Sequence, residues 1–356
     1  MKQRITVALI FGGPSAEHEV SVQSAKSIYA AFDKRKYQLV FIAISRSGQW
    51  YRLPAKTAVD FLKSAAPGTP VSACMDLPQP FVVDISRWKK TMGADVVFPI
   101  IHGPFGEDGT IQALLKAAGI PFVGSDVLAS AACMDKDVAK RLLREAGLPT
   151  ARGLVYQAHE AKSISFATVK KALGLPLFVK PANMGSSIGV SKVQHEKEFN
   201  AALKAAFRYD SKVIIEEGII GREIECAVLG NETPRASLPG EVIAQKDFYS
   251  YDAKYISADG AILKIPAELP KAAIIMIQKA AIKAYMALGC AGLARVDFFL
   301  KQNAELVVNE INTVPGFVSG VSMYPMLWEA SGLSYPKLLD ELITLAWQGP
   351  VRGLGA

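Results

Sequence analysis

The chain has 356 residues, 50% of them hydrophobic and 21% charged, with a formal net charge of +7. This composition is that of a globular protein and excludes an intrinsically disordered chain, and the length predicts two or three domains. The basic balance suits either a phosphate-bearing ligand or an ordinary solvated surface, because no run of Lys and Arg typical of a nucleic-acid-binding arm occurs.

The cysteines and the apolar stretches of the sequence indicate the cellular compartment of the protein. The four cysteines lack metal-like spacing and are expected to be buried free thiols in a reducing environment. The apolar start of the chain runs into Gly12 and Gly13 without a cleavage site, and the apolar stretch 272–288 contains Lys279 and Lys283. We therefore expect a cytoplasmic protein with neither a membrane nor nucleic acid as a partner.

The first predicted unit, residues 1–131, alternates strands and helices. The predicted strand at 94–103 is continuous in Val and Ile, which is typical of a parallel sheet covered on both faces. We therefore predict a doubly wound α/β domain. The strands are expected at 4–11, 37–45 and 94–103, and the helices at 19–32 and from 110 onward.

The remainder of the chain divides into two further units. Residues 132–221 predict a small α+β domain with a partly antiparallel sheet, opened by a helix with Asp135 as its N-cap. Residues 222–356 predict more strands, a long helix over 270–288 and two C-terminal helices. The strands of these two units are expected at 152–157, 175–182, 188–193, 212–217, 222–230, 240–245, 292–300 and 305–311.

The last two strands predict an antiparallel hairpin with polar residues on one face. A turn at 303–304 places Asp297 opposite Glu310 and Arg295 opposite Asn312. Facing carboxylates repel each other unless a cation lies between them. All-oxygen ligands favour Mg²⁺, whose remaining positions phosphate oxygens would fill. The alternative is a salt-bridge cluster of Arg295, Asp297 and Glu310.

Two other stretches could contact phosphates or a nucleotide base, although no Walker A motif is present. The glycine-rich loop 180–189 follows Lys180 and carries Ser186 and Ser187, whose backbone N–H groups and hydroxyls could cover phosphates. Lys136 precedes it on a helix. The segment 213–223 ends an apolar strand in paired acids and could hold adenine and ribose. The alternatives are an ordinary exposed turn and a strand end that reaches solvent.

With these features in place, the sequence resembles the ATP-grasp ligases, and within them the D-alanine–D-alanine ligase family. Seven motifs occur in the family's order and together span the chain. They are GGPSAEHEVS (12–21), HGPFGEDG (102–109), KPANMGSSIG (180–189), YDAKY (251–255), RVDFF (295–299), NEINTVPGF (309–317) and SMYP (322–325).

The resemblance implies a two-part ATP-grasp fold after the N-terminal domain, a homodimer, and a reaction. ATP would phosphorylate the carboxylate of one D-alanine, and the amino group of a second D-alanine would attack the acylphosphate. The tetrahedral intermediate would collapse to the dipeptide, a peptidoglycan precursor. Ligases that join D-alanine to D-serine or to D-lactate are the alternative within this class.

The resemblance assigns residues to the first D-alanine. Glu17 resembles the residue that binds its amino group, as a carboxylate suits an ammonium. His102 matches a histidine near its carboxylate. Ser186 matches a loop serine that links Glu17 to Tyr255 and closes the site against water, which would hydrolyse an acylphosphate. Without the resemblance, Glu17 would be read as a helix N-terminal acid and Tyr255 as a packing aromatic.

The resemblance also assigns the nucleotide, metal and second-substrate residues. Arg295 and the Gly316 N–H would stabilise the oxyanion of the tetrahedral intermediate, and Ser322 and Met323 would receive the second substrate's carboxylate. One extra residue near Gly320, relative to the usual pattern, puts that second pocket in doubt. The nucleotide set is Lys136, Lys180, Ser187, Glu216, Glu217, Ile219, Glu223, Lys254 and Asn309, and the ligands of two Mg²⁺ ions, or of Mn²⁺, are Asp297, Glu310 and Asn312.

Two functions from other classes explain less of the sequence. A nicotinamide-dependent oxidoreductase would use the strand that runs into Gly12 and Gly13, but the third glycine of the dinucleotide fingerprint is missing. A non-catalytic nucleotide-binding module would leave the hairpin carboxylates without a role.

Overall fold

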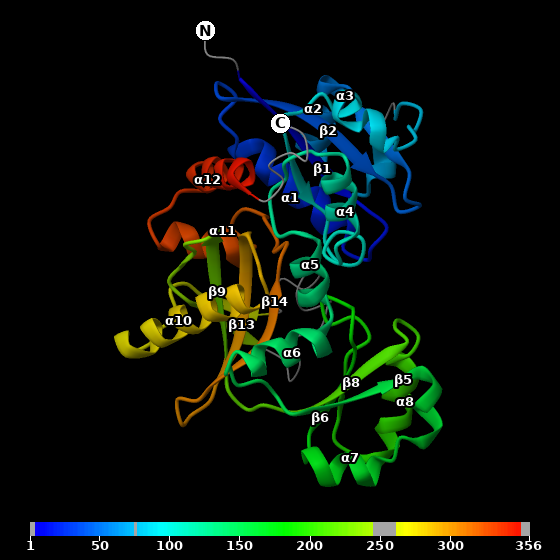
Figure 1. Ribbon diagram of the computed structural model, residues 1–356, viewed down its shortest axis with the longest axis vertical. Helices are drawn as coiled ribbons and strands as arrows, with labels where there is room; N and C mark the ends of the chain where they lie inside the picture. Colours follow the sequence, from blue (N-terminus) through cyan, green and yellow to red (C-terminus); the bar gives the residue numbers. More distant parts are fainter. Residues whose placement is uncertain (1–3, 75–76, 245–260, 350–356) are drawn as a thin grey trace.

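A computed structural model describes residues 4–74, 77–244 and 261–349 of the chain. It contains three sheets, one for each predicted unit, and the fold class is the expected combination of α/β and α+β (Figure 1). Within the described residues, no helix has both the length and the apolar character needed to cross a membrane.

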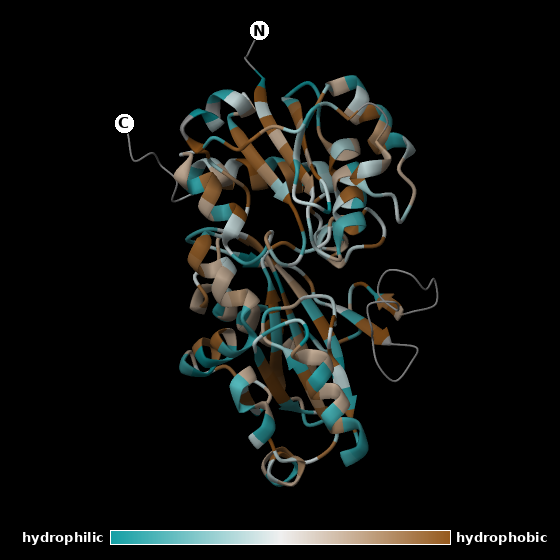
Figure 2. Cartoon of the chain, turned by 90° about the vertical axis from the view of Figure 1, so that its right-hand side faces the viewer, coloured by the Kyte–Doolittle hydropathy of each residue, from teal (hydrophilic) through white to brown (hydrophobic). Residues whose placement is uncertain are grey.

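The N-terminal sheet has the order β3-β2-β1-β4. β1 pairs in parallel with β2 and β4, whereas β3 is an antiparallel edge strand that the sequence analysis did not predict. The apolar strand residues are buried against helices, so hydrophobic colour concentrates in the strands in Figure 2. The elements are β1 (Ile5–Gly12), α1 (His18–Ala31), β2 (Tyr37–Ile44), β3 (Trp50–Leu53), α2 (Ala55–Ser64), α3 (Trp88–Met92), β4 (Val96–Ile100), α4 (Thr110–Ala117) and α5 (Val127–Met134).

The central sheet has the order β5-β8-β6-β7 and is antiparallel throughout. Alternation gives it two different faces: Leu177 and Val179 face the core formed with α7 and α8, whereas Phe178 and Lys180 point the other way. The elements are α6 (Lys136–Glu145), β5 (Gly153–Gln157), α7 (Phe166–Leu173), β6 (Leu177–Pro181), β7 (Ser191–Val193), α8 (Glu196–Ala206) and β8 (Lys212–Glu217).

The C-terminal sheet has the order β12-β11-β9-β13-β14, with the short β10 paired to β9. Its antiparallel core strands carry the predicted hairpin. The elements are β9 (Arg222–Gly230), β10 (Arg235–Ala236), β11 (Gly240–Ala244), β12 (Ala261–Lys264), α10 (Lys271–Ala287), β13 (Gly292–Leu300), β14 (Leu306–Asn312), α11 (Met323–Ala330) and α12 (Tyr335–Gln348).

The three units share cores across their predicted borders. Ala139 and Leu143 of α6 pack with Tyr285 of α10 and the C-terminal sheet, although α6 precedes the central sheet in the chain. α12 lies beside α1 (Figure 1), where Lys36 Nζ is 2.6 Å from Asp340 Oδ2. The predicted border at residue 132 falls within α5, and the domain limits stay predictions.

Candidate active site

The β13–β14 hairpin has the predicted register, with Asp297 opposite Glu310 and Arg295 opposite Asn312. A β-bulge follows, because Phe298 pairs with Val308 and leaves Asn309 as the extra residue. The bulge lets Asn309 and Glu310 line the same cavity despite being consecutive. A strict two-residue period would place these two side chains on opposite faces.

Arg295 is held by two acids. Its Nε and Nη2 atoms each donate to a different oxygen of Asp297 at 2.7 Å, and Nε lies 2.9 Å from Glu225 Oε2. Asn312 Nδ2 donates to Asp297 Oδ2 at 3.0 Å. The Arg295–Asp297 part of the alternative salt-bridge cluster is therefore present, whereas Glu310 lies 3.7 Å from the Nζ atom of Lys136.

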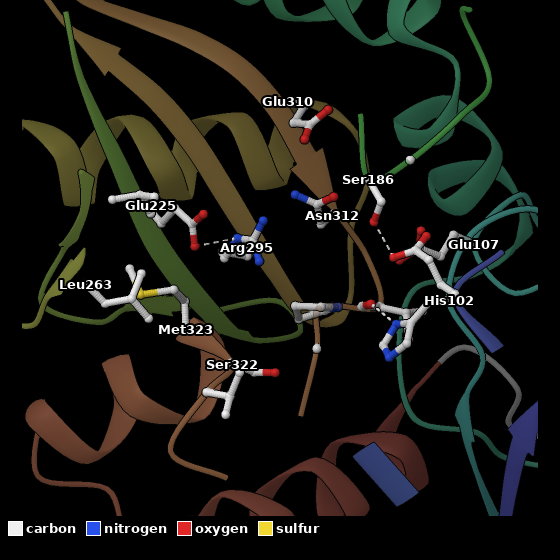
Figure 3. A pocket seen from close by; sticks show the side chains of 17 residues that line it. His102, Glu107, Ser186, Glu225, Leu263, Arg295, Glu310, Asn312, Ser322 and Met323 are labelled. Carbon is white, nitrogen blue, oxygen red and sulfur yellow. Dashed lines mark hydrogen bonds and ion pairs between the residues drawn. The ribbon is translucent and has the colours of Figure 1, made fainter. Parts of the chain in front are cut away.

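The hairpin borders a cavity of about 100 Å³, here called the inner cavity. Figure 3 shows Glu107, Ser186 and His102 on one side, Leu263 and Met323 on the other, and Arg295 between them. Residues that are far apart in the sequence thus meet here. The predicted residues that line the inner cavity are Glu17, His102, Ser186, Arg295, Glu310, Asn312, Gly316, Ser322 and Met323.

The acidic side of the inner cavity joins the N-terminal unit to the glycine-rich loop. The Ser186 hydroxyl donates to the carboxylate of the buried Glu17. Ser186 and Ser187 both have positive φ, at 49° and 60°, which few residues other than glycine adopt. Glu107 accepts a hydrogen bond from the Gly103 N–H, and burial, reinforced by Glu17, raises the pKa of the Glu107 carboxyl. Tyr255 and Lys254 lie outside the described residues.

His102 connects the N-terminal unit to the turn after β14. Burial lowers its pKa, so the ring is neutral, and its Nδ1 lies 3.0 Å from the carbonyl oxygen of Val314. Its Nε2 is 3.2 Å from the hydroxyl of Ser24 on α1, which accepts a hydrogen bond from the Phe317 N–H. A ring protonated on Nδ1 satisfies all three contacts. They fix the turn that presents Gly316 to the cavity.

The opposite end of the inner cavity is built by the start of α11. The Ser322 hydroxyl accepts a hydrogen bond from the Val318 N–H at 2.9 Å. A Cβ atom at Gly316 would lie 2.6 Å from this hydroxyl oxygen, so only glycine permits the close approach. Gly320, near which the resemblance predicts an extra residue, lies in a turn and has φ +71°. Ser322 and Met323 line the wall of the cavity.

A second cavity of about 280 Å³, here called the outer cavity, lies between the central and C-terminal sheets. It combines apolar walls, including Phe178 and Ile219, with cationic side chains. Glu310 and Gly185 line both cavities, so the two meet at the hairpin and the glycine-rich loop. The predicted nucleotide residues that line it are Lys136, Lys180, Ser187, Ile219, Glu223 and Asn309.

Two predicted nucleotide residues, Glu216 and Glu217, do not line this cavity. Glu217 lies 2.6 Å from a guanidinium nitrogen of Arg152. The buried carboxylate of Glu216 lies 2.8 Å from Lys180 Nζ and 2.9 Å from Lys140 Nζ. Each of these two side chains faces a cation of the protein and not the cavity.

The predicted metal site includes an amide side chain as well as carboxylates. In the part of the chain that the structure describes, no group of three or more His, Cys, Asp or Glu side chains could hold a metal. The predicted set instead combines the carboxylates of Asp297 and Glu310 with the amide of Asn312. Two carboxylates and an amide oxygen fit a hard divalent cation that also takes phosphate oxygens. The positive charge of the cation would add to the charges of Arg295 and Lys136 in neutralising the carboxylates of Asp297 and Glu310.

Four residues near the cavities were missed by the sequence analysis. Glu225 alternates with Glu223 along β9, and that polar alternation in an apolar strand was a usable signal. Glu107 lies within the recognised 102–109 motif. Ser24 and Lys140 carried no signal, because a serine or a lysine on an amphipathic helix ordinarily faces solvent.

Comparison with known proteins places this geometry in a family. A family model described as "D-ala D-ala ligase N-terminus" matches residues 6–125, and one described as "D-ala D-ala ligase C-terminus" matches residues 142–344. The D-alanine–D-alanine ligase A of Escherichia coli K12 is 50% identical over 353 residues, covering 97% of this chain and 96% of that protein. The D-alanine–D-alanine ligase of Oceanobacillus iheyensis is 49% identical over 346 residues, covering 96% and 94%.

Solved structures agree with these sequence relatives. The VanG D-Ala:D-Ser ligase of Enterococcus faecalis superposes with a TM-score of 0.84 at 37% identity, covering 97% of this chain and all of that one. The D-alanine–D-alanine ligase of Coxiella burnetii gives 0.82 at 38% identity, covering 97% and 96%. With both halves of the sequence matched and the fold shared throughout, the chain belongs to the D-alanine–D-alanine ligase family.

Proposed function

We propose that the protein uses ATP to join two D-alanine molecules into D-alanyl-D-alanine, a precursor of peptidoglycan. The observation that carries this proposal is the meeting of the two cavities at Glu310 and Gly185. A ligase must bring the terminal phosphate of a nucleotide to the carboxylate of a second ligand. Two adjoining cavities meet that requirement, because one is lined by cations and the other is rich in hydrogen-bonding groups.

The outer cavity suits ATP. Its apolar walls match adenine, and the carboxylate of Glu223, which lines the cavity, would accept hydrogen bonds from ribose hydroxyls. Lys136 and Lys180 face the end nearest Glu310, where phosphates would lie. The Ser187 hydroxyl and the glycine-rich loop backbone would cover those phosphates. Mg²⁺, or Mn²⁺, held by Asp297, Glu310 and Asn312, would neutralise phosphate charge.

The inner cavity suits two small amino acids. Glu17, fixed by Ser186, is the partner for the ammonium of the first D-alanine, and His102 lies beside it. Arg295 and the Gly316 N–H would stabilise the oxyanion that forms when the second amino group attacks. Ser322 and Met323 would receive the second carboxylate. The loop contact at Ser186 would also exclude water from the acylphosphate.

D-alanine is favoured as the acceptor over D-serine or D-lactate. The relatives of about half-identical sequence are named for D-alanine, whereas the D-Ala:D-Ser ligase is 37% identical. The apolar side chains of Val242, Leu263 and Met323 line the acceptor end of the inner cavity and suit a methyl group.

The test is phosphate release and product analysis with purified protein, ATP and Mg²⁺, offering D-alanine alone and then in competition with D-serine or D-lactate at neutral pH. We expect phosphate and D-alanyl-D-alanine in equal amounts, no product from L-alanine, and loss of turnover on addition of EDTA. Phosphate release without dipeptide, or preference for D-serine or D-lactate, would contradict the proposal.

The family resemblance further predicts a homodimer. Light scattering after size-exclusion chromatography would give the mass of a dimer of the 38.3 kDa chain, and a monomeric mass at micromolar concentration would contradict it.

A further inference from the structure

Lys140 is a buried cation that the proposed reaction does not use. It lies on α6 with a side chain 3% exposed, and its Nζ atom is 2.9 Å from Glu216 Oε1. Neither residue lines either cavity. A lysine is almost never buried unless its charge is paired, so this position requires an explanation.

Lys140 belongs to a group of three charged side chains, which also contains Glu216 and Lys180. Glu216 lies between two lysines, because its second oxygen is 2.8 Å from Lys180 Nζ. Burial alone would raise the pKa of Glu216, but Lys140 and Lys180 lower it to about 2, so it stays ionised. Burial lowers the pKa of Lys140 against the opposing pull of Glu216. Lys140 and Lys180 each form an ion pair with Glu216, so the group carries two positive charges and one negative charge.

Of the three side chains in this group, Lys180 alone lines the outer cavity. It lies at the end of β6, whereas Glu216 and Lys140 lie behind it. If Glu216 had Lys180 as its sole partner, the buried pair would be neutral, and it would hold the ammonium away from an incoming phosphate. Lys140, on the other side of the Glu216 carboxylate, gives the group a net charge of +1. Because Glu216 then attracts two ammonium groups, it holds Lys180 less strongly.

We propose that Lys140 is a positioning residue that neutralises Glu216 from behind, so that Lys180 keeps its positive charge available for nucleotide phosphates. The inference rests on the proposed function, since it assumes that the outer cavity binds ATP. It assigns Glu216 a role as the link between two lysines and explains why this acid is placed behind the cavity wall.

The test compares three variants of the full chain by isothermal titration with ATP and with adenosine, at constant ionic strength and in the presence of Mg²⁺. Lys140→Met should weaken ATP binding by about tenfold and change adenosine binding by less than about twofold, because only phosphates sense Lys180. Lys140→Met/Glu216→Gln removes one charge of each sign and should recover most of the lost ATP affinity. Arg141→Met removes the same charge from the neighbouring, exposed position of α6 and should change neither affinity.

The recovery in the double variant separates positioning from structural support, because a merely structural role predicts that the second substitution weakens binding further. ATP affinity of Lys140→Met equal to that of the wild type, equal losses for ATP and adenosine, or no recovery in the double variant would each overturn the inference. Failure of the wild type itself to bind ATP would instead refute the proposed function, and the inference with it.

Discussion

The inner and outer cavities share Glu310, but different kinds of interaction fix the side chains that line them. The inner cavity lies where three units meet, and hydrogen bonds of Ser24, His102 and Ser186 connect its walls. The outer cavity uses one face of the central sheet, and its cations are set by ion pairs such as Lys180–Glu216. The inner cavity should therefore be sensitive to geometry and the outer cavity to charge.

The largest effect is expected at Glu310, because this side chain serves both cavities. Glu310→Gln keeps the shape of the side chain but removes the charge proposed to hold a divalent cation, so turnover should fall by on the order of 10³-fold. Glu305→Gln on the same hairpin is the matched control, since Glu305 is exposed and forms its ion pair with the surface residue Lys301. Coupled phosphate-release assays give both rates. Equal turnover of the two variants would show that the reaction does not need the negative charge of Glu310.

A smaller loss, confined to the inner cavity, is expected at Arg295. Arg295→Lys keeps the charge but loses the planar fork that contacts Asp297 and Glu225, so the group facing the oxyanion is misplaced. Turnover should fall by about 10²-fold while the affinity for ATP changes by less than about twofold. Titration calorimetry and steady-state kinetics measure the two quantities. A loss of ATP affinity as large as the loss of turnover would contradict the separation of the cavities.

Two serines on α1 offer a matched pair for testing the geometry of the inner cavity. Ser24 contacts His102 and accepts from the Phe317 N–H at 3.2 Å, whereas Ser27 accepts from the Ser319 N–H at 3.1 Å, nearer the surface. Ser24→Ala should lower turnover by about tenfold, because the turn carrying Gly316 loses its anchor, and Ser27→Ala should have little effect. Equal rates for the two variants would show that the anchor does not position Gly316.

The sequence predicted most elements because their local signals agree with their tertiary surroundings. The hairpin register, the Asp135 N-cap and the long helix before β13 all followed from residue patterns. The edge strand β3 was missed, since a four-residue strand gives almost no periodic signal. The bulge at Asn309 was also invisible, because an extra residue is defined only by its partner strand.

The site was less accessible to such reasoning than the fold. The cavity-lining residues were named through motifs, and the structure brings most of them together. Glu216 and Lys140 show what motifs omit, since which cation faces a buried carboxylate depends on the packing of α6 against β8. No spacing in the sequence relates these two residues, because β5, α7, β6, β7 and α8 lie between α6 and β8 in the chain.

The smallest expected effect concerns Glu107 and folding stability. Burial raises the pKa of this carboxyl in the folded state, and Glu17 raises it further, so the folded protein holds this proton more tightly than the unfolded chain does. Below the unfolded pKa, near 4.3, both states are protonated and Glu107 costs nothing. As the pH rises from there to the folded pKa, the unfolded chain releases its proton first, and stability falls by up to about 1.4 kcal/mol per pH unit.

Glu107→Gln removes this titration while keeping the size of the side chain. Urea unfolding between pH 4 and pH 8 should therefore show a variant that gains stability relative to the wild type as the pH rises, with little difference at the acid end. Glu329→Gln, at an exposed position of α11, controls for the loss of one surface charge. A difference between Glu107→Gln and the wild type that does not change with pH would mean that Glu107 is already ionised beside Glu17. Glu107 would then carry its negative charge in the inner cavity before any ammonium binds.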